Sequence, residues 1–172
     1  MDFSELARSR YSVRSFQDRP LSQAHLDLIL EAGRLAPTAH NNQPQRIFVA
    51  KSKDALDKLA SVCRCTFGAP TILVVGYDET RERKSRLDPS LRFGVMDSSI
   101  VCTHMMLQAH DIGVGSCWVG LFLPQDVSRV LELPEEVRVT ALLLLGYPAE
   151  DAEPLHLHYS YRDRAQTITE LP

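Results

Sequence analysis

Cysteine is scarce in this 172-residue sequence. It has four cysteines, at positions Cys63, Cys65, Cys102 and Cys117. Their number is too low for a secreted disulfide scaffold, which favours a reducing compartment. Cys63 and Cys65 do not make a zinc motif, because no second Cys/His pair with ligand spacing follows them and zinc takes four ligands. We therefore expect structural free thiols and no metal site.

Long hydrophobic runs and a secretory signal layout are also missing. The apolar stretch Ala141–Tyr147 is far too short to span a bilayer. The N-terminus lacks a charged segment followed by an apolar one. We therefore expect a soluble, cytoplasmic protein with no membrane partner.

Positive charge is not in excess. The chain has 19 Lys and Arg against 22 Asp and Glu, a net charge of -3 and a pI near 6.1. Binding to a phosphate backbone needs a broad basic face, so nucleic acid is not an expected partner. Repeats, low-complexity tracts and Gly/Ser or Pro-rich linkers are absent as well. With 44% apolar residues, residues 1–172 are predicted to form a single domain around one core.

The apolar periodicity predicts helices that alternate with short apolar strands. Helices are expected over residues 2–10, from the Ser22 cap to Pro37, after the Ser52 cap, over Phe93–Asp111 with a stop at Gly113, and from Pro124. Strands are expected over Arg46–Ala50, Thr71–Tyr77 and Val137–Tyr147, with a turn or strand start at Gly115–Gly120. The strands are apolar on both faces, which indicates interior strands covered on two sides.

Two further patterns give specific expectations. In the helix after Ser22, the residues Leu28, Ile29, Ala32 and Leu35 recur at helical spacing and predict its apolar face. Residues Leu155–Arg164, "LHLHYSYRDR", alternate as a strand does. Since a domain of this size offers that tail no obvious neighbour, we expect it to pair with the sheet edge of a second subunit.

The stretch "RSRYSVRSF", residues 8–16, concentrates arginine and serine beside a helix end. Guanidinium groups donate charge-assisted hydrogen bonds, and hydroxyl groups fill the remaining oxygens, so this composition suits a phosphate monoester. Surface arginines paired with acids such as Asp18 are an equal alternative on this evidence alone.

Two other loops carry polar groups. Between Pro37 and the strand at Ile47, the loop holds Thr38, His40, Asn41 and neighbouring amides, which can read the edge of a heterocycle or form a plain polar turn. His40 is expected to belong to the turn. Residues 78–92 are charged and predict a solvated surface loop or a lid.

Together these stretches resemble one family, the nitroreductase-like, FMN-dependent oxidoreductases. The resemblance rests on "RYSVRSF" (10–16), "APTAHNNQP" (36–44), "GVGSCWVG" (113–120), "LLLLGYP" (142–148) and "YRDR" (161–164). Their order and spacing extend through nearly the whole chain. The resemblance implies an α+β fold in which helices sandwich a mixed β-sheet. It also implies an intimate homodimer with FMN at the subunit interface and a C-terminal tail that crosses to the partner.

The resemblance assigns roles in the first motif. Arg10 and Ser12 would hold the FMN phosphate, and Tyr11 would contribute backbone or ring contacts near it. Arg14 would face the N1/O2 side of the isoalloxazine. A fixed guanidinium there stabilises the charge of the reduced flavin and raises its potential. Arg14 would act as a charge and not as a general acid, because a guanidinium keeps its protons at physiological pH.

The other motifs extend the implied site. Arg162 and Arg164 match basic residues that close over the phosphate. The loop that lines the flavin from the other subunit matches Pro37, Thr38, Ala39 and Asn41. The segment that lies against the ring near N5 matches Trp118, Val119 and Gly120. No side chain is assigned as catalytic, because the chemistry would be carried by N5 of FMN.

The implied function is an FMN-dependent oxidoreductase that takes hydride from NADH or NADPH. It would pass hydride or electrons in a ping-pong cycle to a small electron-poor acceptor such as a nitroaromatic or a quinone. One alternative is a flavin-storage protein or electron-carrier partner without NAD(P)H turnover. Another is a protein-interaction module built around residues 78–92.

Three observations limit the resemblance. Gln45 stands where the family often has an aromatic residue, and nothing matches the polar flavin contacts that longer members carry in an insertion. The short chain also lacks the helical insertion that shapes the substrate side, so the acceptor does not carry over. The glycines of "GVGSCWVG" do not form a dinucleotide-binding turn, because Trp118 stands in place of the third glycine and the motif follows a helix.

Overall fold

The computed structural model describes residues 2–171. Its sheet has four strands, β1 (Gln45–Ala50), β2 (Thr71–Asp78), β3 (Gly115–Val119) and β4 (Val137–Gly146), in the order β1-β2-β4-β3. All neighbouring strands pair antiparallel. A parallel bridge between Ser12 and Ser116 adds the N-terminal segment beside β3.

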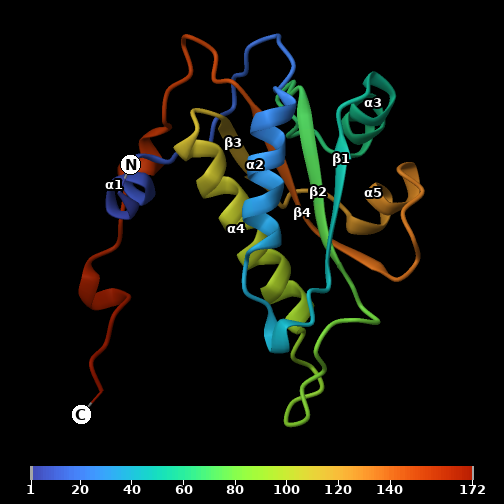
Figure 1. Ribbon diagram of the computed structural model, residues 1–172. Coiled ribbons are helices and arrows are strands. Elements are labelled where there is room, and N and C mark those ends of the chain that lie inside the picture. The colour runs from blue at the N-terminus through green and yellow to red at the C-terminus, as the bar shows by residue number, and fades with distance from the viewer. Residues whose placement is uncertain (1, 172) are drawn as a thin grey trace.

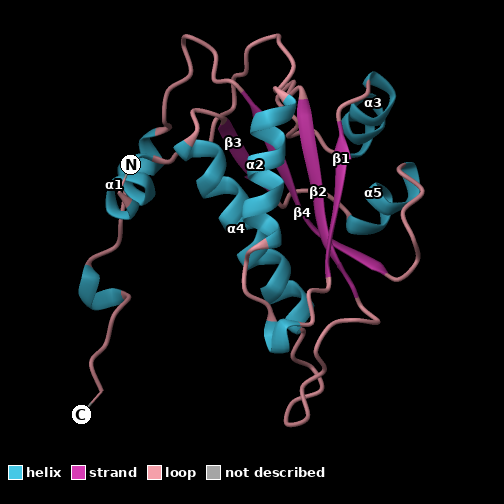
Figure 2. Ribbon diagram, viewed as in Figure 1, coloured by secondary structure: helices cyan, strands magenta, loops and turns pink. Residues whose placement is uncertain are grey.

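Helices cover both faces of the sheet (Figure 1). One face carries α2 (Gln23–Arg34) and α4 (Phe93–Asp111), and the other carries α3 (Lys53–Val62) and α5 (Pro124–Val130) (Figure 2). The short helix α1 (Phe3–Ser9) lies near the C-terminal end of α4. The predicted α+β sandwich is therefore confirmed. No helix among the described residues has the length and apolar character to cross a bilayer.

The two layers of helices exist because the central strands are apolar on both faces. All eight residues of β2 are buried. Leu73 and Val75 belong to the core beneath α2 and α4, and Ile72 and Val74 to the core beneath α3 and α5. Successive side chains of a strand point to opposite faces, so one continuous apolar run supplies both cores. The prediction of interior strands is confirmed for β2 and β4. It is wrong for Arg46–Ala50, because β1 is an edge strand and Val49 is 39% exposed.

The predicted helix ends are also confirmed. The Ser22 hydroxyl accepts a hydrogen bond from the His25 amide at 3.2 Å, and the Ser52 hydroxyl accepts one from the Ala55 amide at 3.3 Å. Each such cap contributes about 1 kcal/mol. At the end of α4, Gly113 has a φ of 76°, a conformation that favours glycine.

The predicted apolar face of α2 is wrong in part. The helix buries Ile29 and Gly33, whereas Leu28 and Leu35 are 50% and 64% exposed. Close packing against α4 decides the orientation of the helix. A Cβ atom on Gly33 would lie 2.8 Å from Cγ of Met105, so α4 occupies the space that a larger residue would need. Tertiary packing has overridden the local pattern.

The strand predicted over Leu155–Arg164 is wrong for this chain. The segment forms two short 3-10 helices, η2 (His156–Tyr159) and η3 (Arg164–Gln166). The tail leaves the sandwich and runs past α1, where it pairs with none of the described strands (Figure 1). A strand requires a neighbour for its backbone groups. Pairing with a second subunit remains a prediction.

Candidate functional site

The "RYSVRSF" segment lies along β3. The Val13 amide donates to the Ser116 carbonyl at 2.9 Å. A Cβ atom on Gly115 would lie 2.9 Å from Cγ2 of Val13, so the two segments approach too closely for any larger residue. The first two glycines of "GVGSCWVG" therefore serve different purposes: Gly113 ends α4, and Gly115 lets the N-terminal segment reach the sheet. Two motifs far apart in the sequence form one unit.

A cavity of about 240 Å³ opens at this unit. It is lined by Arg10, Tyr11, Ser12, Arg14, Leu155, Leu157 and His158. Among residues 2–171, neither the Arg10 nor the Arg14 guanidinium forms an ion pair with a carboxylate. Arg14 Nη1 donates to the Ser12 carbonyl at 3.1 Å, within its own segment. The alternative of surface arginines paired with acids is therefore not what the structure contains.

The charge of this cluster is not neutralised by its neighbours. Burial raises the pKa of the Cys117 thiol on β3, and the nearby Arg14 guanidinium and Ser12 hydroxyl lower it by a smaller amount. The thiol is therefore neutral at physiological pH. Two guanidinium groups and a hydroxyl beside a cavity with no carboxylate in its lining are the donor set that a phosphate needs.

The C-terminal tail forms one wall of the cavity. The Tyr11 hydroxyl donates to the Ala152 carbonyl at 3.1 Å, and the Tyr11 ring lies edge-on to His158 with centroids 6.3 Å apart. Burial raises the pKa of Tyr11. The contributions of Leu155, Leu157 and His158 were not predicted. The only signal for them in the sequence is the alternation of the tail, which had indicated a strand.

Arg162 and Arg164 do not line this cavity. Both are exposed, and both lie further along the tail, Arg164 as the first residue of η3. The structure of one chain therefore does not bring them to Arg10 and Ser12.

Trp118, Val119 and Gly120 end β3 and begin the loop after it. Val119 is buried in the core beneath α3 and α5, Trp118 packs on the opposite core, and Gly120 is exposed. Of the three, Gly120 leaves its backbone open to a ligand, because no heavy atom lies within 4 Å of a Cβ built there.

The loop after α2 is rigidly held. Its turn η1 (Ala39–Asn41) contains two residues with positive φ, His40 and Asn41, both at 54°. The Thr38 hydroxyl accepts from the Gln43 amide at 3.0 Å, and Asp97 Oδ1 on α4 accepts from the Ala39 amide at 2.9 Å. Pro37, Asn41 and His40 are exposed at its surface. The expectation that His40 belongs to the turn is confirmed.

Asp97 is a buried residue that holds the loop in place and that the sequence did not indicate. Its side chain is 2% exposed, and its second oxygen, Oδ2, has no hydrogen-bond partner among the described residues. Burial raises the pKa of Asp97, and the nearby Glu82 carboxylate adds to the rise, while the Ala39 amide opposes it. The hydrogen bond between Asp97 and the Ala39 amide therefore links the exposed loop to α4.

Glu82 anchors the charged loop that follows β2. This side chain is buried and accepts from the Gly94 amide at 3.0 Å, from Lys84 Nζ at 2.7 Å and from Arg92 Nη1 at 3.3 Å. Burial opposes its ionisation, but these partners outweigh burial and hold the pKa of Glu82 below its ordinary value. A bridge between Lys84 and Arg92 closes the base of the loop. The loop is thus fixed at its base and not simply solvated.

The two halves of the predicted site lie at opposite ends of α4. The Ala39 amide donates a hydrogen bond to Asp97 near the start of the helix. Ser9, which precedes Arg10, forms a hydrogen bond with His110 near the end of the helix, with Oγ and Nε2 2.9 Å apart. These two contact residues are 13 positions apart on α4, which is about 20 Å at 1.5 Å per residue. Figure 1 shows η1 and α1 at these two ends. One chain therefore does not bring both halves to one small ligand.

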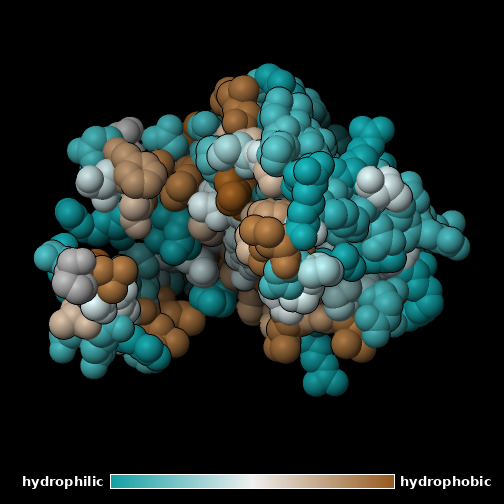
Figure 3. All heavy atoms as spheres, turned by 90° about the horizontal axis from the view of Figure 1, so that it is seen from below, coloured by the Kyte–Doolittle hydropathy of each residue, from teal (hydrophilic) through white to brown (hydrophobic). Residues whose placement is uncertain are grey.

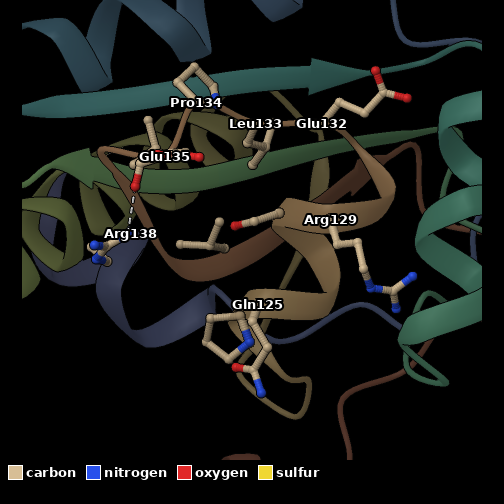
Figure 4. Close-up of a pocket in the computed structure, with 11 residues that line it drawn as sticks. Gln125, Arg129, Glu132, Leu133, Pro134, Glu135 and Arg138 are labelled. Atoms are coloured by element: carbon tan, nitrogen blue, oxygen red, sulfur yellow. Dashed lines mark hydrogen bonds between the residues drawn. The ribbon is translucent and has the colours of Figure 1, made fainter.

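The largest cavity described, about 650 Å³, lies elsewhere, between α5 and the start of β4 (Figure 4). Arg138 donates to the Glu135 carbonyl there and pairs with Glu79, and Arg129 pairs with Asp126. No residue predicted for the site lines this cavity, and its two arginines are already paired. We therefore do not take it as the candidate site.

Comparison with known proteins gives the class of the fold and site. The family model described as Nitroreductase family matches residues 7–67 and 64–147. A nitroreductase family protein from Clostridium difficile superposes with a TM-score of 0.91, at 33% identity over 98% of each chain. The chain belongs to the nitroreductase family, as its sequence motifs had indicated.

The names of two further relatives state an activity or a bound cofactor. A Methanothermobacter thermautotrophicus protein, provisionally named an NADH dehydrogenase/NAD(P)H nitroreductase, is 31% identical over 158 residues, covering 88% of this chain and 80% of its own length. A Desulfovibrio desulfuricans protein, 27% identical with a TM-score of 0.80 over 98% of this chain and 96% of its own, was solved in complex with FMN.

Proposed function

We propose that this chain is an FMN-dependent NAD(P)H oxidoreductase that works as a homodimer. Its acceptor is a small electron-poor molecule of the nitroaromatic or quinone type. The observation that carries the proposal is the cavity beside β3, where Arg10, Ser12 and Arg14 meet without a carboxylate in the lining. Membership of the nitroreductase family and the FMN and NAD(P)H names of its relatives support it.

The residues of the cavity fit the parts of FMN. Arg10 and Ser12 bind the phosphate through charge-assisted hydrogen bonds, and Arg14 holds positive charge beside the ring. Tyr11 keeps the tail against this site through its bond to the Ala152 carbonyl. Gly120, and the backbone of Trp118 and Val119 before it, face the ring from the end of β3. Bound FMN would accept hydride from the nicotinamide and return electrons to the acceptor.

The remaining wall comes from a second copy of the chain. The loop with Pro37, Thr38, Ala39 and Asn41 contacts α4 at Asp97, and the segment with Arg10 contacts it at His110, about 20 Å further along the helix. We therefore place this loop in the site of the partner. Exposed apolar side chains support this assembly. On α4, Val95, Met96 and Ile100 are 44%, 45% and 39% exposed, while seven other residues of the helix are buried. Exposed apolar side chains grouped in this way are typical of an interaction surface.

The tail is the second part that a partner would cover. Leu157, Tyr159 and Tyr161 are 66%, 69% and 77% exposed. Seen from below in Figure 3, apolar and hydrophilic atoms are mixed on the lobe at the left, whereas hydrophilic atoms dominate the side of α3 and α5 at the right. We propose that the tail lies on the partner and brings Arg162 and Arg164 to the phosphate there.

The visible spectrum of the purified protein tests this function. We expect a yellow protein whose flavin absorbance bleaches when NADH or NADPH is added without oxygen and returns when a quinone is added. A yellow protein that neither coenzyme bleaches would instead support a flavin-storage role. A colourless protein that binds no added FMN would refute flavin chemistry altogether and leave the interaction-module alternative.

A further inference from the structure

A second cavity, of about 410 Å³, lies at the N-terminal end of α4. It is formed between the loop after α2 and the charged loop after β2. Its lining consists of Ala39, His40, Arg83, Lys84, Ser85, Arg86, Leu87 and Phe93. None of these residues except Ala39 has a part in the proposed flavin site. The cavity therefore needs an explanation of its own.

The basic residues around this cavity divide into paired and free ones. Lys84 and Arg92 are held by the buried Glu82, and Arg81 pairs with Asp78 at 3.5 Å. Arg83 and Arg86 form no ion pair with any carboxylate among residues 2–171. The Glu82 anchor fixes the base of the loop, so these two free guanidinium groups are presented at the cavity on a supported hairpin.

The position of the cavity connects it to the proposed reaction. Ala39 lines the cavity and also belongs to the loop that we place against the partner's flavin. A dinucleotide whose nicotinamide lay on that flavin would have this loop beside it. The loop continues directly into the surface that carries Arg83, Arg86 and His40. No carboxylate lines the cavity to repel its phosphates.

We propose that Arg83 and Arg86 bind the 2′-phosphate of NADPH and make the enzyme prefer NADPH to NADH; this rests on the proposed function. The charge of the site favours the 2′-phosphate over the pyrophosphate that both coenzymes share. A phosphate monoester carries about two negative charges and three terminal oxygens, which two guanidinium forks can pair with bidentately. Each phosphate of a pyrophosphate bridge carries only one charge.

The test measures binding and turnover with Arg83→Gln and Arg86→Gln. Holoprotein is titrated calorimetrically with 2′,5′-ADP, which carries the 2′-phosphate, and with 5′-ADP, which does not. The kcat/KM values for NADPH and NADH are measured with the same preparations. Arg81→Gln is the matched control, because it removes the same charge from the same loop but its side chain is paired with Asp78 outside the cavity.

We expect each variant to bind 2′,5′-ADP about tenfold more weakly and to lose about tenfold in kcat/KM for NADPH, with NADH changed less than about twofold. Arg81→Gln should behave as the wild type. Equal losses for both coenzymes would assign the site to the pyrophosphate and overturn the proposal, as would a wild type that prefers NADH. A protein that neither coenzyme reduces fails the proposed function, while the 2′,5′-ADP titration still reports on the cavity.

Discussion

Replacing Arg10 by alanine should weaken FMN binding without weakening the fold. Arg10 is half-buried beside Ser12 and Arg14 and forms no ion pair with a described carboxylate. Its removal leaves no acid without a partner, and it relieves repulsion between two guanidinium groups. We therefore expect the apoprotein of Arg10→Ala to melt at the wild-type temperature or slightly above it.

The loss of ligand binding should be large by comparison. A charge-assisted hydrogen bond contributes about 1.5–3 kcal/mol, and a loss of about 2 kcal/mol raises Kd roughly 30-fold. The assay is a fluorescence titration of apoprotein with FMN, because flavin fluorescence changes on binding. Riboflavin, which lacks the phosphate, should bind the variant and the wild type equally.

Arg8→Ala is the matched control, since Arg8 lies two residues earlier on α1, is exposed and does not line the cavity. It should bind FMN like the wild type. Wild-type FMN affinity in Arg10→Ala would remove Arg10 from the phosphate site. A lowered melting temperature of the apoprotein would show that Arg10 stabilises the fold instead, and the reasoning from its missing ion pair would be wrong.

Three other variants test other parts of the structure. Arg14→Gln should keep FMN bound but lower its two-electron potential in a redox titration, and an unchanged potential would contradict the proposed role of the charge. Truncation after Pro148 should abolish dimerisation, measured by light scattering, and flavin binding, measured by absorbance. A truncated protein that remains a yellow dimer would refute the crossing tail. Glu82→Gln should lower the free energy of unfolding by about 1–3 kcal/mol in urea titrations at neutral pH. Because the folded pKa of Glu82 lies below its ordinary value, this difference should shrink as the pH falls through that folded pKa, and a difference that grows in acid would contradict the anchor.

Sequence alone predicted those features that depend on local patterns. The caps at Ser22 and Ser52, the bounds of α4 and the buried runs of β2 and β4 follow from hydrogen-bonding side chains and apolar periodicity, and each is confirmed. The family resemblance is visible in the sequence because its motifs place glycines where two backbone segments approach closely and arginines where positive charge is needed. Gly115 shows why, since its contact with Val13 tolerates no side chain.

What the sequence could not predict depends on packing between distant segments. Leu28 and Leu35 match a helical pattern, but the approach of Met105 to Gly33 turns another face of α2 inward. The tail alternates without becoming a strand, and none of the strands within residues 2–171 pairs with it.

Buried carboxylates were the other features missed. Glu82 stands among arginines and lysines in a segment that the sequence predicts as a solvated surface loop or a lid, yet it is 5% exposed. Asp97 lies within an apolar helix and gives no local signal of its bond to the Ala39 amide. Only the folded chain shows that both support the loops at one end of α4.

The length of α4 also determines how cofactor binding depends on protein concentration. If each flavin takes one end of this helix from each of two copies, a dissociated monomer offers only half of either site. The fraction of chains that retain FMN then depends on the fraction that is dimeric. Activity per chain therefore rises with protein concentration until dimerisation is complete. Two copies damaged at opposite ends of α4 could also rescue one another, because a mixed dimer would still assemble one intact site.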